Sequence, residues 1–107
     1  MKTIKFAAHL VPLILSGEKT STWRLFDDKN LSVGDDLSFV NKETSEEFAS
    51  GKITAVEEKK LGEVTDADFS GHERYKSMEK MYETFRDFYG DRVTPETVVK
   101  MIDFEVV

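Results

Sequence analysis

Two hydrophobic periodicities alternate along the chain, and together they predict a fold in which strands outnumber helices. A period of two, typical of half-buried strands, predicts strands at residues 2–7, 20–26, 37–40, 48–57 and 98–107. Helical spacing of apolar residues predicts a short helix over residues 9–16 and a longer one over residues 77–89. The pattern therefore indicates an α+β, mostly β fold: a small antiparallel or mixed barrel of about five to six strands flanked by two to three helices.

Turn and cap residues mark the ends of these elements. Gly17 and Gly90 can each take the left-handed conformation that ends a helix. Thr65 and Asp66 are able to cap a further short helix, and Gly51 suggests a bulge or bend inside the fourth strand. The longer helix carries an apolar stripe that we expect to pack against the barrel, formed by Met78, Met81, Tyr82, Phe85, Phe88 and Tyr89.

The length of the chain predicts a single domain over residues 1–107, without linkers or repeats. A hydrophobic fraction of 39% beside a charged fraction of 34% is typical of a globular chain and not of a disordered one. The apolar run at residues 6–15 is interrupted by His9 and Pro12, lacks a cleavage site and is too short to span a bilayer as a helix. We therefore expect a cytoplasmic protein with no membrane partner.

Charge and composition exclude several classes of function. Fifteen basic and twenty-one acidic residues give a net charge of −6, which opposes tight non-specific binding of nucleic acid and favours a small or neutral ligand. The lack of cysteine excludes disulfides, thiolate zinc sites and cysteine nucleophiles. With His9 and His72 as the two histidines, a histidine metal site or a Ser-His-Asp triad is disfavoured, and we expect neither a metal nor a cofactor.

The densest group of reactive side chains lies at residues 17–24, which read GEKTSTWR. On a strand, Thr20, Thr22 and Arg24 share one face. Polar groups with a guanidinium on one face are consistent with a solvent-filled pocket. A hydroxyl needs a base to become a nucleophile, and a desolvated Lys19 beside the Arg24 cation could serve as that base.

The same segment also has a plainer interpretation, which the pattern alone leaves open. Threonines are common on strands for their β-propensity, and surface lysines and arginines are usually solvated. Trp23 is expected in the core.

Gly17, Lys19 and Arg24 match the G-x-K-x-x-x-x-R signature of ASCH domains, small β-barrels of the PUA-like superfamily. The chain resembles this family over nearly its whole length, through the segments LILSGEKT, STWRLF, LSVGDDLSFV and GHERYKSMEKMYETFRDFYG. The resemblance implies a PUA-like barrel.

One position departs from many ASCH domains, which have glutamate two residues before the signature arginine where this chain has Thr22. The chain instead resembles a bacterial branch of small ASCH proteins that act as N4-acetylcytidine amidohydrolases and carry the motif K-T-x-T-x-R. That resemblance implies Lys19, Thr22 and Glu73 as catalytic residues, with Glu79 and Glu63 as poorer candidates for the carboxylate.

The mechanism that the resemblance implies is acyl transfer. Lys19 acts as base toward Thr22, whose hydroxyl attacks the amide carbonyl, and Glu73 passes the proton to the leaving amine. If the Glu73 carboxylate keeps Lys19 charged, Lys19 is an electrostatic anchor and a water or Glu73 is the base. Arg24 or the backbone near Gly17 could stabilise the oxyanion. The residues expected to contact the substrate are Arg24, Thr20, Gly17 and His72.

The expected partner is therefore a small-molecule nucleoside, bound by a monomer or weak dimer. An alternative is a non-catalytic RNA-binding module, with a basic stripe formed by Lys5, Lys19, Arg24, Lys52, Lys59 and Lys60. A regulatory domain that binds a small ligand is a third possibility.

Overall fold

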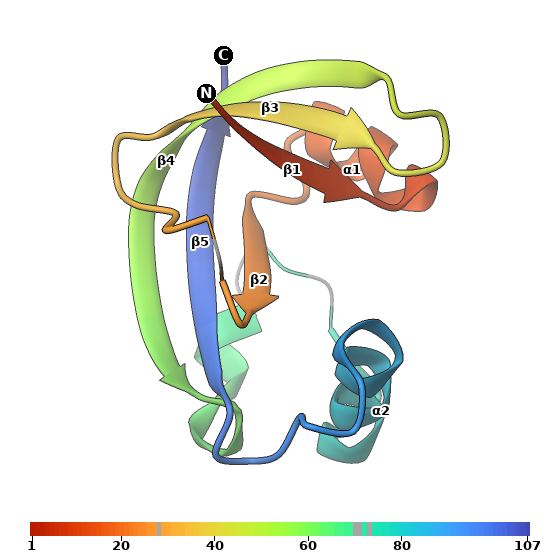
Figure 1. Cartoon of the computed structure of the whole chain (residues 1–107), viewed down its shortest axis with the longest axis vertical. Coiled ribbons are helices and arrows are strands. Elements are labelled where there is room, and N and C mark those ends of the chain that lie inside the picture. The colour runs from red at the N-terminus through yellow and green to blue at the C-terminus, as the bar shows by residue number, and fades with distance from the viewer. Residues whose placement is uncertain (28, 70–71, 73) are drawn as a thin grey trace.

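The computed structural model of the chain describes residues 1–27, 29–69, 72 and 74–107, and within them five strands form one curved sheet (Figure 1). The strands are β1 (Lys2–Phe6), β2 (Ser21–Leu25), β3 (Asp36–Asn41), β4 (Glu47–Lys60) and β5 (Val98–Val106). Their order across the sheet is β1-β3-β4-β5-β2. β1 runs parallel to β3, and the other neighbouring pairs are antiparallel.

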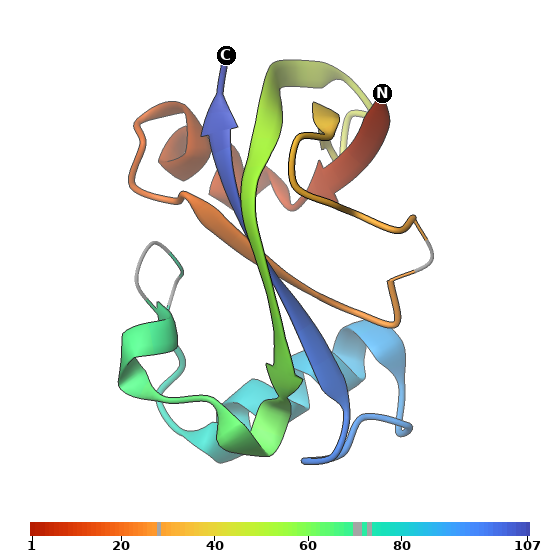
Figure 2. The same ribbon diagram turned by 90° about the vertical axis from the view of Figure 1, so that its left-hand side faces the viewer.

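The sheet curls into a half-barrel, so β1 and β2 remain as its two edges. Figure 2 shows the long strands β4 and β5 crossing the molecule from end to end, with both termini at one end. The predicted α+β, mostly β class is confirmed. The expected barrel is open, because β1 and β2 do not pair with each other.

Both predicted helices are present. The first is a 3-10 turn η1 (Ala8–Leu10) that continues into α1 (Val11–Leu15), and the second is α2 (Met78–Tyr89). Two further 3-10 turns, η2 (Leu61–Glu63) and η3 (Asp66–Phe69), follow β4. No helix among the described residues is long and apolar enough to cross a membrane.

Local chemistry explains where these helices begin and end. Gly17 and Gly90 follow the two α-helices with φ angles of 83° and 89°, in the region that glycine favours. The Ser77 hydroxyl accepts a hydrogen bond from the Lys80 amide at 3.2 Å and so caps α2.

Buried apolar side chains form two clusters. One lies inside the curl of the sheet and consists of Ile4, Phe6, Ile14, Leu31, Leu37, Phe39, Ile53, Ile102 and Phe104. The other joins β2 and β5 to α2 and consists of Trp23, Leu25, Leu61, Met81, Phe85, Val93, Val99 and Met101. β2 takes part in the second cluster through Trp23 and Leu25, which confirms the core position expected for Trp23.

The bulge suggested at Gly51 is not present there. Gly51 pairs in register with Leu37 and Val106, and β4 shifts register on either side of it, at Phe48 opposite β3 and at Thr54 opposite β5. A Cβ at Gly51 would lie 2.6 Å from the Glu105 carbonyl oxygen. The glycine therefore allows a close approach of two strands.

The apolar stripe on α2 is only partly a packing surface. Met81 and Phe85 are buried as expected, whereas Met78 and Phe88 are 41% and 63% exposed. The prediction that the whole stripe packs against the barrel is thus wrong for these two residues. For Phe88 the reason is a cavity, described next, that separates it from the sheet.

Candidate functional site

A cavity of about 440 Å³ lies where the end of β1, the η1 turn, strand β2 and helix α2 meet. Its walls combine cationic, hydroxyl and aromatic side chains. The lining residues are Lys5, Phe6, Ala7, His9, Leu10, Lys19, Thr22, Trp23, Arg24, Lys42, His72, Tyr75, Thr84, Phe85, Phe88 and Tyr89. Lys19, Thr22, Arg24 and His72, all predicted site residues, therefore line one cavity.

Lys19 is positioned by the turn that follows α1. Its amide donates to the Leu13 carbonyl at 3.0 Å, which holds the turn against the helix. Its Nζ donates to the Ser21 carbonyl oxygen at 2.7 Å, and the residue is only 4% exposed. Because the Ser21 carbonyl belongs to the peptide that precedes Thr22, the amine is anchored next to Thr22. Burial of this kind disfavours the charged form of an amine.

Thr22 occupies the middle of β2, where it pairs with Ile102 of β5. It is 4% exposed and lines the cavity. The plainer interpretation of Lys19 as a solvated surface lysine is therefore wrong.

Arg24 lies two residues further along the same strand and reaches across the open side of the half-barrel. Its Nη2 donates to the Lys5 carbonyl oxygen at 3.2 Å, and its Cζ lies 5.2 Å from the centre of the Phe6 ring. Arg24 thus connects β2 to β1, the two edge strands of the sheet. These contacts hold the guanidinium against the cavity that Thr22 also lines.

Aromatic rings form much of the remaining wall. The Trp23 indole stacks on the His72 ring, with centroids 4.3 Å apart and an interplanar angle of 24°. The indole Nε1 is buried and has no hydrogen-bond acceptor among the residues that the structure describes. Phe88 projects from α2 with the Lys42 ammonium 5.1 Å from its ring centre. Such a wall suits a flat, partly polar ligand.

Other predicted residues lie elsewhere. Thr20 is exposed and lines a separate cavity with Ser21 and Asp68, so it does not line the cavity that contains Thr22. Gly17 forms the turn after α1 and is not among the lining residues. Glu73, the predicted third catalytic residue, lies outside the described residues. The alternative carboxylates are both exposed, Glu63 in η2 and Glu79 on α2, and neither lines the cavity.

Sequence reasoning missed several cavity residues, chiefly Lys42, Tyr75, Phe88 and Tyr89. Phe88 and Tyr89 could have been found from the sequence, because α2 has more apolar residues along one side than are needed to pack it against the sheet. For Lys42 and Tyr75 no local pattern marks the position.

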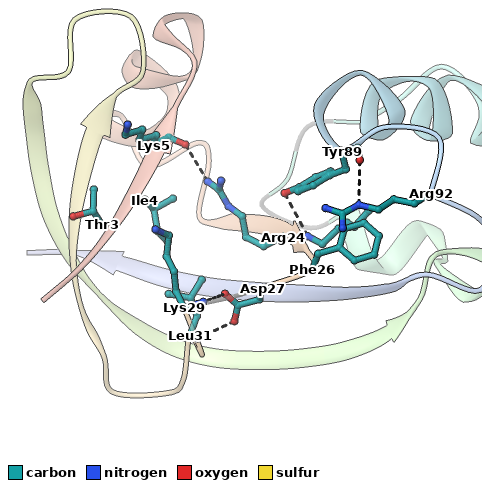
Figure 3. Close-up of a pocket in the computed structure, with 11 residues that line it drawn as sticks. Thr3, Ile4, Lys5, Arg24, Phe26, Asp27, Lys29, Leu31, Tyr89 and Arg92 are labelled. Atoms are coloured by element: carbon teal, nitrogen blue, oxygen red, sulfur yellow. Dashed lines mark hydrogen bonds between the residues drawn. The ribbon is translucent and has the colours of Figure 1, made fainter.

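A second cavity of about 520 Å³ adjoins the first, since Lys5, Arg24 and Tyr89 line both (Figure 3). At its wall Asp27 accepts hydrogen bonds from Lys100 Nζ at 2.8 Å and from the amides of Lys29 and Leu31 at 2.9 Å. Burial alone would raise the pKa of Asp27, but these hydrogen bonds outweigh burial and lower it. Asp27 is therefore a structural carboxylate whose charge Lys100 balances.

No group of three or more acidic or histidine side chains in the described part of the chain is arranged to hold a metal ion.

No family model and no curated protein matches the chain. Solved structures do match. A protein from Enterococcus faecalis V583, described with the family model DUF984, has a TM-score of 0.76 at 22% identity, over 92% of this chain and 70% of that one. The ASCH domain from Lactobacillus crispatus has a TM-score of 0.75 at 21% identity, over 98% and 78%. The ASCH protein from Zymomonas mobilis has a TM-score of 0.68 at 10% identity, over 96% and 65%. The chain therefore has the fold of the solved ASCH domains.

Proposed function

We propose that this chain, which has the ASCH fold, is an amidohydrolase that removes the acyl group from N4-acetylcytidine or a related acylated cytosine nucleoside. The observation that carries the proposal is the convergence of a buried amine, a buried hydroxyl and a guanidinium on one cavity, through Lys19, Thr22 and Arg24. Chemistry of this kind needs a nucleophile held beside a base in a site of low dielectric constant.

In the proposed reaction, Thr22 is the nucleophile and Lys19 its base. As the Thr22 Oγ bonds to the acyl carbon, its proton passes to Lys19 Nζ, and the bond from that carbon to the cytosine amine breaks. The departing amine takes up a proton, for which Glu73 is the residue implied by family resemblance. Water then cleaves the acyl ester on Thr22: its oxygen bonds to the acyl carbon, one of its protons returns to Glu73, and the proton on Lys19 returns to the Thr22 oxygen. The carboxylic acid leaves, and all three residues regain their starting forms.

The other residues of the cavity would bind and orient the substrate. The aromatic wall offers ring surfaces for a pyrimidine, with Tyr75 and Phe88 from two parts of the chain. Arg24 carries a fixed positive charge to the same wall. His72, stacked on Trp23, would help to shape the pocket.

The direct test is the release of cytidine from N4-acetylcytidine by the wild type and by single variants. We expect turnover by the wild type, and a loss of at least about a hundredfold in kcat for Lys19→Ala and Thr22→Ala, because each removes a group that acts in the transition state. Thr20→Ala is the matched control, since Thr20 is a threonine of the same segment that lines a different cavity. Undiminished turnover by Thr22→Ala would rule out Thr22 as the nucleophile.

The alternative of an RNA-binding module rested on a basic stripe, and the contacts of those lysines do not favour it. Lys59 Nζ lies 3.0 Å from Asp68, and Lys60 Nζ lies 2.9 Å from Glu96. Lys19 is buried in the cavity. These cations are engaged within the chain, which weakens their contribution to a phosphate-binding surface. Salt-dependent RNA binding without hydrolysis of the nucleoside would favour the alternative.

A further inference from the structure

The second cavity is a cationic site in an acidic protein. Arg24 of β2, Lys29 of the following loop and Arg92 beyond α2 bring three positive side chains to its walls. Asp27 is the one carboxylate among its lining residues in the described part of the chain, and Lys100 balances it at 2.8 Å. Lys5 contributes its carbonyl oxygen, which Arg24 contacts, while its ammonium points away from Arg24 (Figure 3). The described side chains around this cavity therefore carry a net positive charge, although the whole chain carries −6.

Neither Lys29 nor Arg92 is paired with a carboxylate of the residues that the structure describes. A carboxylate does pair with each of Lys2, Lys52, Lys59, Lys60, Lys80 and Lys100. An anion is the ligand that such a site would attract.

Arg92 is held in place by strained local structure. Its guanidinium lies 3.9 Å from the centre of the Phe26 ring, and its Nε donates to the Tyr89 carbonyl oxygen at 3.2 Å. Phe26 adopts a φ of 52°, in the left-handed region that bulky residues rarely occupy. Backbone strain of this kind is concentrated at functional sites, where the surrounding structure maintains it. Figure 3 shows Arg24 and Arg92 approaching the cavity from two sides, with the Phe26 ring beneath Arg92.

We propose that this cavity binds the phosphate of the substrate, so that the enzyme acts on an acylated cytidine 5′-monophosphate in preference to the free nucleoside. This inference rests on the proposed function, because Arg24 lines both cavities and so connects the base site with the phosphate site. Guanidinium groups match phosphate oxygens in charge and geometry, and an ammonium adds a point charge. A base stacked on the aromatic wall would direct its sugar toward Arg24.

A mononucleotide fits these observations better than an RNA strand does. A terminal phosphate carries close to two negative charges, which three cations can neutralise within one cavity. An RNA strand would need cations along an extended surface. Lys59 and Lys60, which the predicted basic stripe includes, are instead paired with Asp68 and Glu96.

The first test is calorimetric binding of cytidine 5′-monophosphate and of cytidine. We expect the wild type to bind the nucleotide at least about tenfold more tightly, and Lys29→Gln and Arg92→Gln each to lose about tenfold in nucleotide affinity only. Lys52→Gln is the matched control, since Lys52 is an exposed lysine of β4 that lines neither cavity. Equal affinity for the two ligands, or an equal loss in Lys52→Gln, would overturn the proposal.

The second test compares kcat/KM for N4-acetylcytidine, its 5′-monophosphate and a short RNA that contains the acylated base. We expect the monophosphate to be the best substrate, by about tenfold over the nucleoside. Equal kcat/KM for nucleoside and nucleotide would refute the proposed phosphate site but not the proposed amidohydrolase activity. A preference for the RNA would overturn the choice of a mononucleotide. Nucleotide binding that depends on Lys29 and Arg92, without any turnover, would instead refute the amidohydrolase alone.

Discussion

Burial distinguishes Lys19 from the lysines of the surface. The Lys60 side chain is 51% exposed and pairs with Glu96, as lysines commonly do, whereas Lys19 is 4% exposed and bonded to a backbone carbonyl. The identity and spacing of Lys19 and Thr22 were visible in the sequence. Their burial was not, because the residues that cover them come from β1, η1 and α2.

The partly buried pair of Asp27 and Lys100 makes stability depend on pH. Burial would raise the pKa of Asp27, but the hydrogen bonds from Lys100, Lys29 and Leu31 lower it below the value of an unfolded aspartate, about 3.9. A lowered pKa contributes stability at pH values above that of the unfolded group, and this contribution is lost as the pH falls through the folded pKa.

We therefore predict that Asp27→Asn lowers the free energy of unfolding by about 1–3 kcal/mol at neutral pH. The difference from the wild type should shrink below about pH 4. Urea unfolding at several pH values measures both effects. Glu43→Gln, which removes an exposed carboxylate, is the control. A pH-independent difference for Asp27→Asn would contradict the role of its charge.

Strand β2 shows that the surroundings of a strand are harder to predict than its position in the sequence. The alternation of the sequence assigned Thr22 and Arg24 to one face and Trp23 to the other. In the structure Ser21, Thr22 and Trp23 are all buried. Trp23 packs with Phe85 of α2, with ring centres 6.5 Å apart, while Thr22 faces the cavity toward β1. The period of two identifies the strand, but what covers each face depends on distant parts of the chain.

The pairing of β3, β4 and β5 depends on the absence of a side chain at Gly51. A Cβ there would lie 2.6 Å from the Glu105 carbonyl oxygen and 2.8 Å from Phe39 Cζ. We predict that Gly51→Ala destabilises the protein by about 1–3 kcal/mol, since the fully buried Phe39 ring and a paired strand must both shift. Thermal unfolding measures the loss. The neighbouring Ser50→Ala is the control, and equal stability of the two variants would contradict the close packing.

Helix α2 illustrates the limit of hydrophobic patterning. Its bounds, its Ser77 cap and its final glycine were predictable because they depend on neighbours in the sequence. The pattern could not separate Phe85, which is buried, from Phe88, which is exposed beside a cavity. Both are apolar residues on the same side of the helix, and the difference depends on where the half-barrel remains open.

At the scale of the whole molecule, the open side of the half-barrel positions both cavities. β1 and β2 are far apart in the order of the sheet, yet Arg24 connects them through the Lys5 carbonyl. The strand count and the fold class followed from the sequence. The open side between β1 and β2 did not follow from the sequence, because it results from the parallel pairing of β1 with β3, which no local pattern specifies. The net charge of −6 likewise hides the local excess of positive charge beside Arg24.

The most direct test of the account is to quench the enzyme during turnover of N4-acetylcytidine and to locate the acyl group by mass spectrometry. We predict an acetyl ester on the peptide that contains Thr22, formed by the wild type and by Thr22→Ser, which keeps a hydroxyl. Thr22→Val keeps the shape of the side chain without the hydroxyl, and it should form no ester and release no cytidine. Release of cytidine by Thr22→Val at the rate of the wild type would contradict the account.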